Sequence, residues 1–313
     1  MRKEILQQVS IVQEHELQKI DRTSQKSISY SQLLSYSTCP HQWANSYIRN
    51  LQEYKPSIHT CFGTAFHETL QEWLTVLYEE SIKKSSEMDL DTLLMEKMQQ
   101  IYAKEKDRYG QHFSNSQELS DFHSDGVEIL KFIRKKRASY FSNSKTHLVG
   151  VEIPLLYEVS KNIFFKGFID VVLYNENSDS YTVIDIKTST SGWNSYAKKD
   201  SKKLAQLLLY KVFLAKQFGL DVEKVDVQYF IVKRKVPVDP EYPAMGRRVQ
   251  EFVPSSGKIK RGQVVASLQK FLGNAFSSDG KYVEKEYEKV PSKSNCMFCS
   301  YKSTEHCNAH IVL

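Results

Sequence analysis

Apolar and polar positions divide the chain into a helical half and a half rich in extended segments. From about Gly63 to Tyr140, apolar residues recur three or four positions apart, the spacing of helices that bury one face. The polar stretch from Ser114 to Ser124 interrupts this pattern and predicts a loop. A shorter helix is predicted after Ser29 or Ser31, either of which is a candidate N-cap. Residues 1–26 are polar and predict an N-terminal arm or helix.

The pattern changes near Leu148, where three extended runs begin. They span residues 148–159, 163–174 and 181–187. They are rich in Val, Ile, Phe and Tyr, and the short polar links between them predict hairpins. A helix over 204–219 and a further extended run over 225–235 follow. Because hairpins join antiparallel strands and a helical crossover joins parallel ones, this order predicts an α/β fold with a mixed central sheet flanked by helices.

Composition places the chain among ordinary folded proteins. Of 313 residues, 41% are hydrophobic and 26% charged, which argues against a disordered chain. The net charge of +6 is compatible with a nucleic-acid partner but equally with a solvated surface. No apolar run is long enough to cross a bilayer, and the N-terminus lacks the apolar core of a signal peptide. A cytoplasmic location is therefore expected, in which the five cysteines are reduced, metal-bound or catalytic.

An acid and a lysine stand together at the end of the third extended run. Side chains on a strand alternate between faces, so Asp185 and Lys187 point one way, and Ile184 and Ile186 the other. Asp170, in the preceding run, approaches Asp185 if the two runs form a hairpin. Two converging carboxylates suit a hard cation such as Mg²⁺, which polarises a phosphodiester and lowers the pKa of a bound water. The alternative is an ion pair at the surface of a strand end.

Two segments, GFIDVV with Asp170 and VIDIKTS with Asp185, resemble the paired motifs of the PD-(D/E)XK nuclease superfamily. The resemblance is to its branch of RecB-like and CRISPR-associated exonucleases. Two further segments are similar to that branch: GTAFHETL, which contains His67, and LAQLLLY, which contains Gln206 and Tyr210 in a Q-x-x-x-Y motif. The order and spacing of these short motifs are jointly specific.

The resemblance implies a restriction-endonuclease-like core. It implies a nuclease domain over residues 27–313, with a helical insertion at about 70–145 and a terminal iron–sulfur lobe. It also implies a set of metal ligands: His67, Asp170, Asp185 and the carbonyl of Ile186. The ion would be Mg²⁺ or Mn²⁺, and an imidazole ligand favours the softer Mn²⁺.

The remaining motif residues have implied catalytic roles with structural alternatives. Lys187 would orient the attacking water or neutralise charge on the phosphate. Gln206 and Tyr210 share a helix face, where they would hold Lys187 and contact a phosphate, or simply pack. His67 is alternatively a satisfied core residue, and Glu152 is either a third carboxylate near the metal or an exposed edge residue.

Three cysteines lie close together near the C-terminus, and a fourth lies far from them in sequence. The four are Cys39, Cys296, Cys299 and Cys307. Four thiolates suit a 4Fe–4S cluster or a structural zinc ion. His306 and His310 could replace a cysteine in a zinc site. Resemblance to the AddB-type arrangement favours the cluster, in a lobe formed by the Cys39 region and about 290–313.

Cys61 has no partner by spacing and is expected to be a small buried residue. A Cys–His hydrolase that pairs Cys61 with His67 is the alternative, and it would require an activating base in contact with the thiol.

Basic and aromatic residues near the motifs are candidate DNA contacts. Two clusters flank the acid–lysine segment: Lys198, Lys199, Lys202 and Lys203, and then Lys233, Arg234 and Lys235. Such positions suit phosphate binding, although charge runs are often solvated faces. Trp193 and Tyr196 either stack on unpaired bases or pack in the core.

Two functions follow from these observations. The first is a Mg²⁺- or Mn²⁺-dependent deoxyribonuclease, most simply an exonuclease, that acts in DNA repair, recombination or phage-type DNA processing, with a helicase or recombination protein as partner. The second is a catalytically silent DNA-binding or partner-docking module of a larger complex. The complete set of two acids and a lysine favours the enzyme.

Overall fold

The structure, a computed structural model, describes residues 26–141 and 145–309. The predicted N-terminal arm (up to residue 25) and His310 lie outside the described residues. The helices before the central strands are α2 (Tyr30–Thr38), α3 (Pro40–Tyr47), α4 (Ile58–Thr75), α5 (Ile82–Glu87), α6 (Leu90–Tyr109), α7 (Ser116–Lys135) and α8 (Arg137–Tyr140), with a π-helical turn at Val76–Glu80. The later helices are α9 (Ser195–Lys199), α10 (Ser201–Phe218), α11 (Lys258–Ala275) and α12 (Lys293–Cys296), with a 3₁₀ turn at Val222–Lys224.

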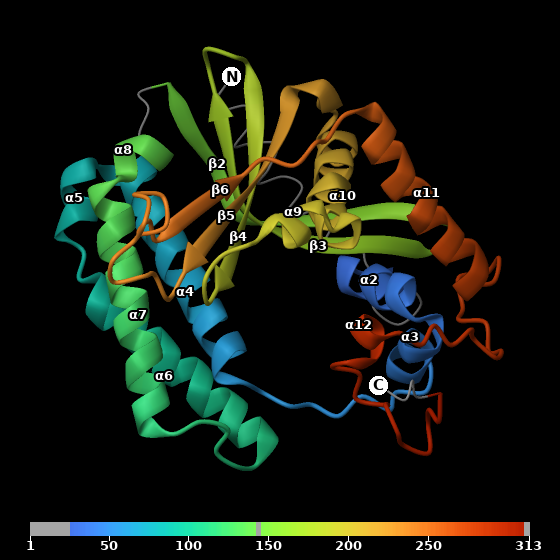
Figure 1. Ribbon diagram of the computed structural model, residues 1–313. Helices are drawn as coiled ribbons and strands as arrows, with labels where there is room; N and C mark the ends of the chain where they lie inside the picture. Colours follow the sequence, from blue (N-terminus) through green and yellow to red (C-terminus); the bar gives the residue numbers. More distant parts are fainter. Residues whose placement is uncertain (1–25, 142–144, 310–313) are drawn as a thin grey trace.

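A mixed sheet lies at the centre of the fold (Figure 1). Its strands are β1 (Lys26–Ile28), β2 (Thr146–Ser160), β3 (Ile163–Asn175), β4 (Ser180–Ser189), β5 (Val225–Lys233) and β6 (Val249–Phe252). The strands β2, β3 and β4 pair antiparallel, as the two predicted hairpins require. Helix α10 crosses over to β5, which is parallel to β4, and β6 adds an antiparallel edge. The predicted mixed α/β sheet is confirmed.

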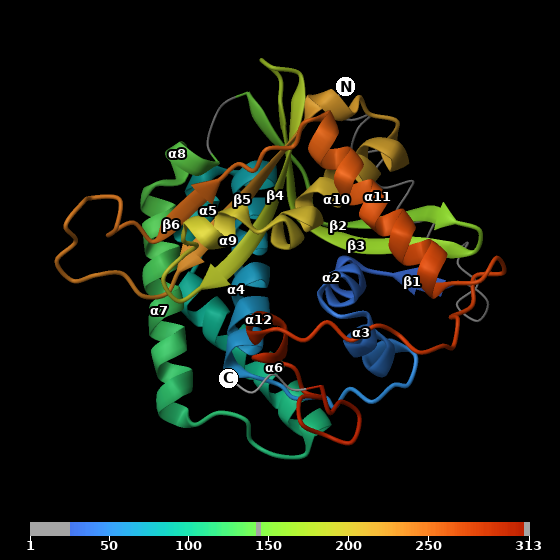
Figure 2. The same cartoon turned by 45° about the vertical axis from the view of Figure 1, so that its right-hand side comes forward.

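Helices cover both faces of this sheet (Figures 1 and 2). On one face α4, α6 and α7 pack in an apolar cluster in which Phe66 of α4 lies with Ile184 and Ile186 of β4. On the other face α10, α11 and α2 pack in a second cluster, in which Leu207 of α10 lies with Val183 of β4. The alternation of side chains along β4 thus supplies both cores.

Helix α4 is held close to the sheet at its start. Ser57 caps its N-terminus through a reciprocal bond with Thr60. A Cβ atom on Gly63 would lie 3.3 Å from Oγ1 of Thr188, a tighter contact than most Cβ atoms make, so the glycine favours this close approach of the helix to β4. This approach sets the distance between α4 and the strand that carries Asp185.

The prediction of a loop from Ser114 to Ser124 was wrong, because most of this stretch is helical. Helix α7 begins at Ser116, because Asn115 caps it by accepting a hydrogen bond from the backbone of Glu118. Its first turns are polar because one side faces solvent, while Phe122 is buried. In the described parts of the chain, no helix is both long and apolar enough to span a membrane.

Candidate active site

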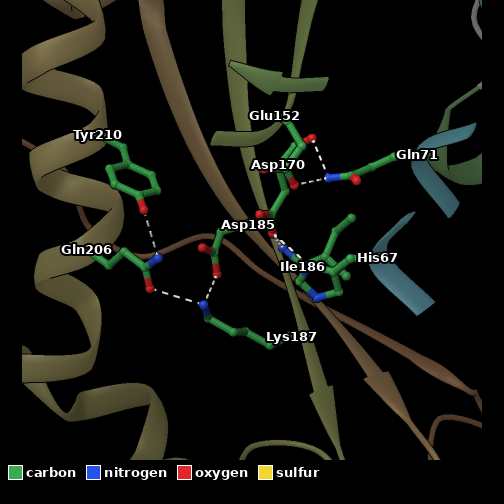
Figure 3. Close-up of polar contacts among 9 residues, drawn as sticks. All are labelled: His67, Gln71, Glu152, Asp170, Asp185, Ile186, Lys187, Gln206 and Tyr210. Atoms are coloured by element: carbon green, nitrogen blue, oxygen red, sulfur yellow. Dashed lines mark hydrogen bonds and ion pairs between the residues drawn. The ribbon is translucent and has the colours of Figure 1, made fainter. Parts of the chain in front are cut away.

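The two predicted acids meet where β3 and β4 part. The strands pair from Asn175 with Ser180 up to Val171 with Ile184, and the next pair in this register would be Asp170 with Asp185. At that point the backbone N–H of Ile186 donates to Oδ2 of Asp170 at 2.6 Å (Figure 3). The end of the ladder therefore places two carboxylates side by side.

A chain of polar contacts connects Asp185 to helix α10 (Figure 3). The side chain of Asp185 is almost fully buried and lies 2.7 Å from Nζ of Lys187. Nζ of Lys187 also donates to Oε1 of Gln206 at 3.0 Å, and Nε2 of Gln206 donates to the hydroxyl of Tyr210 at 3.1 Å. Gln206 and Tyr210 therefore hold the lysine on the same side as the acid.

Helix α4 brings His67 to the opposite side of the carboxylates. Nδ1 of His67 lies 3.6 Å from Oδ2 of Asp170, and its ring hydrogen-bonds with the backbone of Ile186. Burial lowers the pKa of His67 to about 4, which leaves the imidazole neutral near pH 7 and able to act as a ligand.

Glu152 lies opposite Asp170, and a residue that the motifs did not identify holds it. Its neighbours Val151 and Ile153 pair with Val171 and Ile169 of β3. Nε2 of the buried Gln71 donates to Oε1 of Glu152 at 2.6 Å and to the carbonyl of Asp170 at 3.1 Å. The sequence left two alternatives for Glu152, a third carboxylate near the metal or an exposed edge residue. Glu152 is exposed, yet it also lies beside the site.

The sequence contains a signal for Gln71, because it stands four positions after His67 and so shares its helix face. The backbone of Glu152 is strained, because its φ of 49° lies in the left-handed region that a residue with a Cβ rarely adopts.

Burial dominates the electrostatics of the acid pair. It raises the pKa of Asp185 to about 6 and the pKa of Asp170 to about 6, although the charge of Lys187 opposes both shifts. Because burial disfavours the charged form of both carboxylates, a cation bound between them would stabilise their ionised state.

The donor set suits a divalent cation, but the side chains are turned toward internal partners. Among the described residues, no three His, Cys, Asp or Glu side chains are spaced as a ready metal site. Asp170 accepts from Ile186, and Asp185 contacts Lys187. A bound cation would compete with these partners.

The four predicted cysteines gather around one small pocket. Cys39 stands between α2 and α3, and its sulfur accepts the N–H of Val290 at 3.5 Å. The other three, from the C-terminal segment, line the same pocket: Cys296, Cys299 and Cys307. The structure thus brings together residues from both ends of the described chain.

Cys61 is buried against the carbonyl of Met98, and burial raises the pKa of its thiol to about 11. A thiol with so high a pKa is a poor nucleophile at neutral pH, which supports the structural role expected for Cys61.

The two basic clusters differ in their surroundings. Lys199 and Lys203 are exposed. Lys198 and Lys202 are partly buried. In the second cluster, Lys233 is buried and donates to the carbonyl of Met245.

Arg234 is also buried, and it pairs with Asp125 at 3.0 Å. Lys235 pairs with the same carboxylate at 2.9 Å. Arg234 and Lys235 share this one carboxylate, which neutralises one of their two charges, so this second cluster offers less free charge to DNA than its sequence suggests. Trp193 packs against Tyr229 at 4.7 Å, whereas Tyr196 is 84% exposed.

Comparison with known proteins identifies the family. The family model of the PD-(D/E)XK nuclease superfamily matches residues 27–304. No curated protein matches the chain. Among solved structures, a candidate exonuclease from Eubacterium rectale matches at 10% identity and a TM-score of 0.45, over 91% of this chain and 90% of that one. The family match covers most of the sequence, including both acids and the lysine, and the chain belongs to the PD-(D/E)XK nuclease superfamily.

Proposed function

We propose that this nuclease is a metal-dependent deoxyribonuclease that degrades DNA from an end. The observation that carries the proposal is the convergence of Asp170, Asp185 and Lys187 where β3 and β4 part. Two carboxylates and a neutral imidazole are a donor set that suits Mg²⁺ or Mn²⁺.

Asp170, Asp185, His67 and the carbonyl of Ile186 would hold the ion. The ion would supply Lewis-acid activation of the phosphodiester and of a bound water. Lys187, held by Gln206, would orient the attacking water and offset charge that develops on the phosphate. Tyr210 fixes Gln206 and so keeps the lysine in place.

DNA is the proposed substrate. The exposed lysines before and at the start of α10, Lys199 and Lys203, would contact its phosphates. DNA repair, recombination or phage-type DNA processing is the proposed setting, with a helicase or recombination protein as partner.

The four-cysteine pocket would hold a 4Fe–4S cluster, with zinc as the alternative. Four thiols around one pocket, without an acidic side chain among its lining residues, are the donor set that both groups take. Such a cofactor would tie Cys39 to the C-terminal segment.

Cleavage assays with the purified protein test this function. Labelled single- and double-stranded DNA should be degraded with Mn²⁺ or Mg²⁺ and not with a chelator. Asp185→Ala and Lys187→Ala should abolish degradation while circular dichroism shows a folded protein. If wild-type protein binds DNA but yields no product with either metal, the chain is instead a silent DNA-binding module.

A further inference from the structure

A groove of about 350 Å³ lies between α2, α10 and α11, outside the acid–lysine site. Its floor is apolar and comes from three helices: Leu33, Leu204, Leu208 and Val264. This volume is within the range of about 300–1,000 Å³ of clefts that bury a ligand. The groove is therefore large enough for a flat apolar group.

The rim of this groove is positively charged. Lys199, Lys202 and Lys260 line it, and its lining contains no acidic side chain. None of the three lysines forms an ion pair with another described residue. An apolar floor beneath lysines that form no ion pair suits bases attached to a phosphate backbone.

Helix α10 lies between the groove and the active site. Leu204 and Leu208 line the groove, while Gln206, between them in sequence, holds Lys187. With about 3.6 residues per turn, Gln206 points to roughly the opposite side of α10 from Leu204 and Leu208, so the groove and the active site flank the same turn of this helix.

Tyr30 is a second residue shared by the surroundings of the groove and of the active site. Its hydroxyl donates to the carbonyl of Lys202 at 2.8 Å and its ring lines the groove. Burial, together with the charges of Asp185 and Asp200, raises the pKa of Tyr30, in keeping with a hydroxyl near both acids.

We propose that this groove binds an unpaired strand of nucleic acid, with a base on the leucine floor and neighbouring phosphates on the lysines. The inference rests on the proposed nuclease function and names its substrate as a strand that is single at the active site. Tyr30 gives the groove an aromatic edge on which a base can stack. An apolar protein segment is the other occupant to be tested.

Binding can be measured without turnover by the fluorescence anisotropy of a labelled oligothymidylate, with Ca²⁺ in place of Mg²⁺. Lys199→Glu combined with Lys260→Glu should weaken binding about tenfold or more and make the salt dependence shallower. Lys104→Glu, the same charge change on the exposed side of α6, is the matched control and should bind like wild type. Ser267→Trp, which fills the groove from α11, should also weaken binding.

Photocrosslinking locates the strand directly. An oligonucleotide with 5-iododeoxyuridine should crosslink to the peptide that contains Tyr30. Wild-type affinity in both groove variants, or crosslinks elsewhere only, would overturn the proposal and leave the groove to a protein segment. Because neither assay needs cleavage, failure of the nuclease assay would not imitate either result.

Discussion

The backbone N–H of Ile186 donates to the carboxylate of Asp170 at 2.6 Å, a bond that stands where the β3–β4 ladder ends. An unpaired N–H would otherwise be left at this buried point. The side chain of Asp170 therefore has two roles: it accepts a backbone hydrogen bond from β4, and it supplies a carboxylate to the site. Asp185, in contrast, contacts a side chain, Nζ of Lys187, at 2.7 Å.

Gln206 is predicted to act through Lys187. Gln206→Leu removes both the acceptor for Nζ of Lys187 and the donor to Tyr210. We expect kcat to fall by about 10–100-fold, the range for the loss of a supporting hydrogen bond at a metal site, with KM changed less. Gln100→Leu, the same substitution at an exposed position of α6, should leave kcat unchanged. Equal kcat in the two variants would contradict this role.

Local sequence predicted which residues share a face of β4. Alternation along residues 181–187 separated Asp185 and Lys187 from Ile184 and Ile186, and the structure has the same division. The polar links predicted both hairpins because each joins strands that are adjacent in sequence. Such pairings depend on few residues and so leave a clear pattern.

Contacts between segments that are far apart in the chain give no local sequence pattern, so they could not be predicted in the same way. Strand β6 has four residues and pairs as an edge, and β1 has three. Arg234 reads as a free charge because its partner, Asp125, lies 109 positions away. The division of the chain into arm, insertion and nuclease domain stays a prediction.

Backbone strain at Glu152 predicts an unusual order of stabilities. Glu152→Gly and Glu152→Ala both lose the bond to Gln71, so their difference reports the left-handed backbone. The glycine variant should be more stable by about 1–2 kcal/mol. Urea unfolding measures this. At Glu158, also in β2 but without a positive φ, alanine should be the more stable, and the same order at both positions would refute the strain.

Gly167 provides the space in which Tyr210 lies. A Cβ at this position would come within 2.8 Å of Cε1 of Tyr210. Gly167→Ala should therefore cost about 1–3 kcal/mol of unfolding free energy. In a Tyr210→Ala background the cost should largely disappear, which a double-mutant cycle measures. Gly273→Ala, in α11 with open space around it, should be neutral or stabilising.

Metal affinity should depend on pH through the two carboxyl groups. Their pKa values of about 6 mean that below pH 6 an incoming ion must displace protons from Asp170 and Asp185. Affinity for Mn²⁺ should thus rise with pH, by up to about 100-fold per unit for two protons, and level off above about pH 7. His67, with its pKa of about 4, stays neutral throughout and adds little. Calorimetric titration with Mn²⁺ from pH 5 to 8 tests this, and a flat profile would contradict it.

The cysteine pocket predicts that a bound cofactor holds the two ends of the described chain together. Cys39 and Cys307 are far apart in sequence, so ligation by both would close a long loop and stabilise the fold. Cys39→Ser should lower the cofactor content of anaerobically purified protein and its unfolding midpoint. Cys61→Ala, at the buried cysteine outside the pocket, should keep the cofactor although it loses some packing. Iron with labile sulfide in wild type identifies a cluster, stoichiometric zinc identifies the alternative, and equal metal content in both variants and wild type would exclude Cys39 as a ligand.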